Sequence, residues 1–100
     1  MGDTFTFQIK GEAARFAPIS EDNIEMLHTL YSMGAPGLKI YKAMMTVLRE
    51  CSSEEQWERL TDRVVEKQIG SKEIAEAIKK LMSKTVAAHK GDGAPAADDE

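Results

Sequence analysis

The sequence predicts a mostly helical α+β fold: an N-terminal β-hairpin packed on a small bundle of about four helices, followed by a disordered acidic C-terminal tail. Three observations support this fold class. Near the N-terminus apolar and polar residues alternate, which is typical of a half-buried strand. From residue 20 onward apolar residues recur every three or four positions, as on one face of a helix. Glycine, proline and serine interrupt these helical stretches.

The hairpin is predicted over residues 4–17. Phe5, Phe7 and Ile9 alternate with threonine and glutamine, so the three apolar side chains share one face. Gly11 supplies the positive φ that a tight turn requires, and Pro18 ends the second strand. A two-stranded hairpin is marginally stable alone in water, so it must pack against the helices or lend an edge to another chain.

The predicted helices span about residues 20–33, 38–51, 53–68 and 71–88. Ser20 is a good N-cap for the first helix, and Gly34 is its expected C-terminal glycine. The second helix follows the loop "GAPG" at 34–37, which combines two glycines with a proline.

The third helix is predicted to begin with a capping box, in which Ser52 is paired with Glu55. Its expected buried face holds Trp57, Leu60, Val64 and Val65, with Trp57 as the core anchor. Gly70 is expected to end this helix, and Ser71 to cap the fourth.

Size and charge suggest one domain over residues 1–88 and a tail over 89–100. The first 90 residues hold 13 basic and 13 acidic side chains, so the net charge of −4 comes from four acids in 91–100. Such a neutral body has little electrostatic drive toward nucleic acid. The sequence has neither an apolar run of membrane-spanning length nor an export leader, so we expect no membrane partner.

No reactive group has the neighbours that catalysis or metal binding needs. Cys51 is the single cysteine, and His28 is its only plausible histidine partner as a nucleophile. The two histidines and the cysteine do not have metal-ligand spacing. We therefore expect no enzyme activity, no metal and no cofactor. A helix–turn–helix DNA reader over residues 53–82 is an alternative, weakened by the neutral body.

The second helix is the best candidate for a protein-binding surface. Met44 and Met45 are adjacent, about 100° apart on a helix, so one narrow stripe does not easily bury both. Each methionine alone fits a gap in the core, whereas the helix as a whole fits an interface, because Ile40 and Val47 widen its apolar arc. The predicted partner-binding residues are Phe5, Phe7, Ile40, Met44, Met45 and Val47.

The order of these features resembles a known family. The segments "DTFTFQIKG", "FAPI" and "SSEEQWERLTDRVVEKQIGSKEIAEAIKKLM" are similar to small tail assembly chaperones of long-tailed phages that infect actinobacteria. The resemblance covers the layout of residues 3–82 and includes the "EQW" start of the third helix.

This resemblance implies a non-enzymatic assembly factor in the host cytoplasm. Such chaperones coat the tape measure protein until tail-tube subunits polymerise around it, which makes the tape measure protein the expected partner and the major tail protein a second candidate. An open hairpin edge could also join copies, so self-association is expected. The alternatives are a small helical DNA-associated or regulatory domain and a structural head–tail subunit of the virion.

Overall fold

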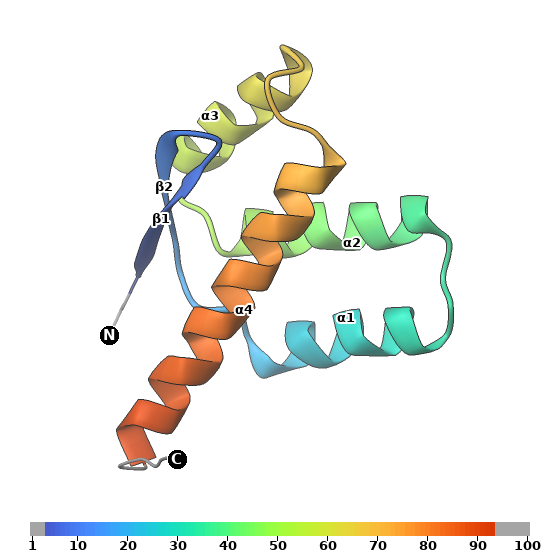
Figure 1. Cartoon of the computed structure of the whole chain (residues 1–100), viewed down its shortest axis with the longest axis vertical. Coiled ribbons are helices and arrows are strands. Elements are labelled where there is room, and N and C mark those ends of the chain that lie inside the picture. The colour runs from blue at the N-terminus through green and yellow to red at the C-terminus, as the bar shows by residue number, and fades with distance from the viewer. Residues whose placement is uncertain (1–3, 94–100) are drawn as a thin grey trace.

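The structure is a computed structural model, and it describes residues 4–93, with side chains placed through residue 88. An N-terminal antiparallel hairpin packs against four helices, which confirms the predicted fold class (Figure 1). The elements are β1 (Phe5–Ile9), β2 (Glu12–Phe16), α1 (Glu21–Ser32), α2 (Gly37–Glu50), α3 (Glu54–Val65) and α4 (Ser71–Gly93). The predicted disorder of residues 94–100 lies outside the described residues.

The hairpin turns through Lys10 and Gly11, between the paired residues Ile9 and Glu12. Both turn residues have positive φ, 51° and 87°, as a two-residue turn of the I′ type requires. Gly11 was the predicted turn residue, and Lys10 shares its left-handed conformation. β2 ends at Phe16, ahead of Pro18 as expected.

The ends of α1 are those the sequence predicts. The Ser20 hydroxyl accepts a hydrogen bond from the Asn23 amide at 3.2 Å. Gly34 follows the helix with a φ of 69°, and its amide donates to the Tyr31 carbonyl at 3.0 Å. This left-handed glycine closes the last turn of the helix.

The N-cap of α3 is Ser53, so the predicted capping role of Ser52 is wrong. The Ser53 hydroxyl accepts from the Gln56 amide at 3.1 Å. The Ser52 hydroxyl instead donates to the Leu48 carbonyl of α2. Ser52 thus adds a second donor at the end of the preceding helix, because the Leu48 carbonyl also accepts from the Cys51 amide at 3.1 Å.

The junction between α3 and α4 also differs from the prediction. α3 ends at Val65, and Lys67, with a φ of 64°, takes the left-handed conformation expected of Gly70. Gly70 belongs to the start of α4, because its amide donates to Glu73 Oε1 at 2.8 Å and its carbonyl accepts from the Ile74 amide at 3.1 Å. α4 then continues past the predicted end at residue 88 to Gly93, so residues 89–93 are helical rather than part of a tail.

One core holds the elements together. α4 packs against α2 and β1, and α1 packs against α2 (Figure 1). The largest buried side chains of the core come from the hairpin and all four helices: Phe16, Leu27, Val47, Leu48, Leu60, Ile74 and Leu81. The predicted buried face of α3 is partly wrong, because Leu60 is buried and Trp57 and Val64 are half-buried, but Val65 is 76 % exposed.

Within residues 4–93 no helix is both long and apolar enough to cross a membrane.

Candidate functional site

Two of the predicted partner-binding residues of α2 are core residues. Met44 is 6 % exposed and Val47 is 0 % exposed, so neither offers a surface to a partner. The physical reason is that α2 packs against both α1 and α4. A helix with two neighbours can bury an apolar arc that a single neighbour would leave open, and this arc was interpreted from the sequence as an interface.

The other predicted residues lie between core and surface. Phe5, Phe7, Ile40 and Met45 are half-buried and pack against the core. The ring of Phe7 lies 5.4 Å from the ring of Phe16, centroid to centroid, and Lys80 Nζ lies 5.9 Å from the centroid of Phe7. The two hairpin phenylalanines therefore contact the body and still keep part of their surface free.

An apolar depression of about 600 Å³ forms a groove between α1 and α4, with Met44 of α2 among the residues that line it. We call it the apolar groove. Its remaining lining residues are Leu27, His28, Tyr31 and Ser32 from α1 and Lys72, Ala75, Glu76, Ile78, Lys79 and Met82 from α4. The predicted residue Met44 is thus brought to this site, although it is nearly covered.

Helical spacing accounts for this lining. Leu27 and Tyr31 are four residues apart, and Ala75, Ile78 and Met82 repeat at three and four, so each set forms one stripe on its helix. Leu27 and Ile78 are buried at the contact of the elements, whereas Tyr31 is 59 % exposed. The groove therefore has an apolar interior and an aromatic side chain at its margin.

Charged side chains flank the α4 side of the groove. Lys72, Glu76 and Lys79 are exposed and occur at helical spacing along one side of α4. Among the described residues none of the three forms an ion pair within 4.0 Å. This margin has an excess of positive charge and is free to meet acidic groups of a partner.

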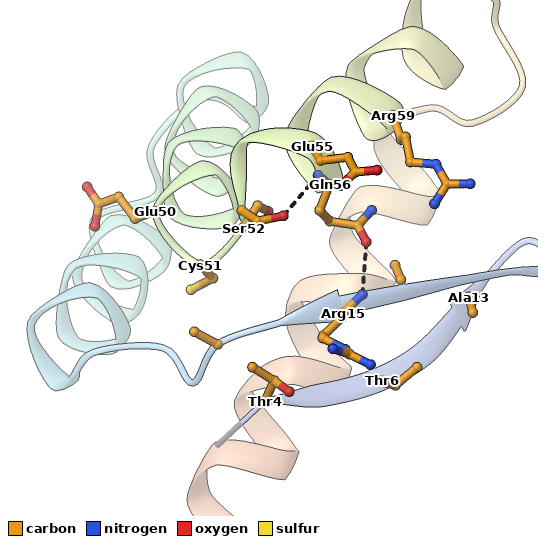
Figure 2. A pocket seen from close by; sticks show the side chains of 13 residues that line it. Thr4, Thr6, Ala13, Arg15, Glu50, Cys51, Ser52, Glu55, Gln56 and Arg59 are labelled. Atoms are coloured by element: carbon orange, nitrogen blue, oxygen red, sulfur yellow. Dashed lines mark hydrogen bonds between the residues drawn. The ribbon is translucent and has the colours of Figure 1, made fainter. Parts of the chain in front are cut away.

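A second cavity, of about 520 Å³, is lined mostly by polar residues together with three alanines, and we call it the polar cavity (Figure 2). Strand residues such as Thr6 and Arg15 line one side of it, and Gln56 and Arg59 of α3 line the other. Gln56 Oε1 accepts a hydrogen bond from the Arg15 amide at 3.1 Å. A second backbone bond, from the Ala17 amide to the Cys51 carbonyl at 2.7 Å, ties β2 to the junction of α2 and α3.

Cys51 borders this polar cavity, but its thiol is unsuited to nucleophilic chemistry. Burial, and secondly the negative charge of Glu50, raise the pKa of Cys51 to about 11. At neutral pH the thiol is therefore protonated, and the thiolate is the nucleophilic form. His28 lines the apolar groove rather than the cavity that holds Cys51. Among residues 4–93 no group of three or more His, Cys, Asp or Glu is arranged to hold a metal ion.

Sequence reasoning missed most of the groove. Leu27, Ile78 and Met82 lie on apolar helix faces of the kind typical of core residues, so their spacing does not mark them as a surface. Tyr31 and Leu38 also lie on apolar faces, yet they are 59 % and 71 % exposed. No signal in the sequence could have found the groove, because apolar spacing does not show how closely two helices pack.

Comparisons with protein-family models, with curated proteins and with solved structures find no match to this chain.

Proposed function

We propose that this protein is a non-enzymatic assembly factor that holds an apolar helix of a larger protein, as expected of a phage tail assembly chaperone acting on a tape measure protein. The observation that carries the proposal is the apolar groove between α1 and α4. The resemblance in the order of sequence features supplies the identity of the client, and the groove supplies a place to hold it.

The dimensions of the groove suit a helix. Its α4 wall extends from Lys72 to Met82, which corresponds to about 15 Å at the rise of an α-helix. That length presents about three turns to a client, enough for apolar anchors at spacings of three, four and seven residues. The groove is open to solvent along the exposed ring of Tyr31.

Methionine makes the groove adaptable. Met82, which is half-buried, contributes an unbranched side chain that can change conformation to fit different apolar partners, and the nearly buried Met44 lines the groove beside it. A tape measure protein presents many helical segments of different sequence, so a chaperone for it benefits from contacts that tolerate variation. The role of Met44 in this proposal is that of a groove residue beneath the client.

Charge at the margin suggests the orientation of the client. Lys72 and Lys79 lie along the α4 wall without an ion-pair partner in the described part of the chain. An amphipathic client helix with apolar residues toward the groove and acidic residues beside them would meet both lysines. These rim contacts add specificity more than affinity.

Co-expression tests the proposal. We expect a tape measure protein, the large coiled-coil-rich client encoded beside such chaperones, to be soluble with this chain and to aggregate without it. Tyr31→Asp places a charge at the groove margin and should reduce the soluble client severalfold. Val65→Asp is the matched control, since it changes an apolar residue that is even more exposed, 76 % against 59 % for Tyr31, at a helix C-terminus away from the groove.

Three outcomes would contradict the proposal. The client could remain insoluble with the wild-type chain, Tyr31→Asp could match the wild type, or Val65→Asp could fail equally.

The salt dependence of client binding is a separate test. Binding should persist or strengthen in high salt, because it is apolar. A steep loss with salt would indicate nucleic-acid binding instead. Mass spectrometry of finished particles should not detect this chain, whereas a virion subunit would remain.

A further inference from the structure

The two edges of the hairpin differ. On the outer edge of β2, the Arg15 amide donates to Gln56 Oε1 and the Ala17 amide donates to the Cys51 carbonyl. Figure 2 shows Arg15 of β2 between Gln56 of α3 and Thr6 of β1. The end of the β2 edge at Arg15 and Ala17 is therefore closed by the protein itself.

The outer edge of β1 is open. Thr6 pairs with Arg15, and the Arg15 amide points away from β1, so this pair is not hydrogen-bonded within the hairpin. The Thr6 amide and carbonyl consequently point away from β2, and by the period of two those of Thr4 and Gln8 do the same. Among the described residues, none hydrogen-bonds to the backbone of these three.

The sequence of this open edge carries little of the usual protection against pairing, although Glu76 and Lys80 of α4 border its Gln8 end. Natural edge strands carry charges, prolines or bulges that prevent association with other strands. Residues 4–9, "TFTFQI", contain neither a charged residue nor a proline, and the hairpin pairing runs without a bulge from Phe5 to Ile9. Phe5 and Phe7 stand on this strand with part of their surface free.

We infer that two copies of this chain pair through their β1 edges into a continuous four-stranded antiparallel sheet, with a two-fold axis at Thr6. The inference does not depend on the proposed function. Each Thr6 then faces Thr6 of the partner subunit, and Thr4 faces Gln8 of the partner subunit. Every such pair exchanges both of its N–H···O bonds, so all the open backbone groups at these positions are satisfied.

The same register aligns the side chains. Phe5 lies opposite Phe7 of the partner subunit on the inner face, so the half-buried aromatic rings extend across the new interface. Threonines meet on the other face, where cross-strand threonine pairs are favourable. A register shifted by one residue would place the amides that already bond to β2 at the interface. A shift by two residues would again pair open backbone groups, but the alignment centred on Thr6 is the one that pairs all three of Thr4, Thr6 and Gln8.

The first test is the mass in solution. We expect sedimentation equilibrium of the wild type to give about twice the chain mass of 11.1 kDa. Thr6→Pro removes the central amide, which the hairpin does not use, and should give a monomer with an unchanged circular dichroism spectrum. Thr6→Val keeps the amide and should remain a dimer. A monomeric wild type at the highest soluble concentration, or a dimeric Thr6→Pro, would overturn the inference.

Disulfide trapping tests the register itself, in a Cys51→Ala background. Thr6→Cys places two thiols opposite each other at a Cα separation of about 5.5 Å, which a disulfide can span. It should form a covalent dimer on oxidation. Gln8→Cys is the matched control, because Gln8 faces Thr4 of the partner subunit and should remain uncross-linked. Cross-linking of Gln8→Cys without Thr6→Cys would rule out the two-fold axis at Thr6, whatever the outcome of the client experiment.

Discussion

The Thr85 hydroxyl of α4 accepts a hydrogen bond from the Ile19 amide at 3.1 Å, inside the core. Thr85 is 1 % exposed, and Ile19 belongs to the segment that connects the hairpin to α1. The bond satisfies a buried backbone donor that no strand or helix would satisfy. It also holds the exit of the hairpin against the last helix.

Replacing Thr85 should therefore lower the free energy of unfolding to the extent that the hydroxyl is lost. Thr85→Val keeps the shape but leaves the Ile19 amide without an acceptor, and should lower the free energy of unfolding by about 1–3 kcal/mol. Thr85→Ser keeps the hydroxyl and should lose less. Urea unfolding measures both, and hydrogen exchange at the Ile19 amide should accelerate only in Thr85→Val. A Thr85→Val protein as stable as Thr85→Ser would show that the bond contributes nothing.

The two adjacent serines before α3 should behave differently. Ser53→Ala removes the N-cap acceptor of the Gln56 amide and should cost about 1 kcal/mol of stability. Ser52→Ala removes a donor to a carbonyl at the end of α2, where backbone amides already provide partners, and should cost less. Thermal or urea unfolding of both variants checks the assignment. A larger loss of stability in Ser52→Ala than in Ser53→Ala would identify Ser52 as the N-cap instead.

The ionised Glu73 carboxylate should contribute to the free energy of unfolding at neutral pH, and this contribution should be lost in acid. Its pKa is lowered, first by the hydrogen bond from the Gly70 amide and also by the nearby Lys10 and Lys72. A lowered folded pKa means stability that is complete above the pKa of the unfolded chain and is lost as pH falls through the folded value. The advantage of the wild type over Glu73→Gln should thus shrink from pH 7 to pH 3 in urea unfolding. A constant difference would contradict this.

Cys51 should resist alkylation in the folded protein. Because its pKa is raised to about 11, little thiolate exists at pH 8, and the side chain is buried. Iodoacetamide at pH 8 should modify the native protein far more slowly than the urea-unfolded protein, as followed by mass spectrometry. Equal rates would mean that the thiol is exposed and ionised. For the same reason, folding stability should fall as pH rises from the ordinary thiol range toward 11.

The parts of the fold that sequence reasoning found are local. The alternation of Phe5, Phe7 and Ile9 and the positive φ of Gly11 depend only on neighbours in the chain, and both are as expected. Ser20 and Gly34 were found for the same reason. The error at Ser52 arose where two adjacent residues could perform the same capping role, and the error at Gly70 arose because Lys67 takes the left-handed conformation three residues earlier. The choice between the two serines depends on where the preceding helix ends.

The candidate site was predicted less well, because exposure is not a local property. Met44 and Val47 are covered since α2 has two packing neighbours. Tyr31 is uncovered although it lies on an apolar stripe, because it is near the end of α1 and packing does not extend over it. No periodicity in one helix indicates how many other helices will pack on it or how far they will reach.

By itself, the sequence determined that a hairpin precedes four helices and where most of them begin, because turns, caps and apolar spacing act over a few residues. Only the tertiary structure decided which apolar side chains are buried and that α1 and α4 leave a groove between them. It also decided that the outer edge of β2 is hydrogen-bonded to α3 and the α2–α3 junction, whereas the outer edge of β1 is not hydrogen-bonded among the described residues. These outcomes depend on contacts between residues far apart in the chain, such as Arg15 with Gln56, and such contacts exist only once the elements have packed.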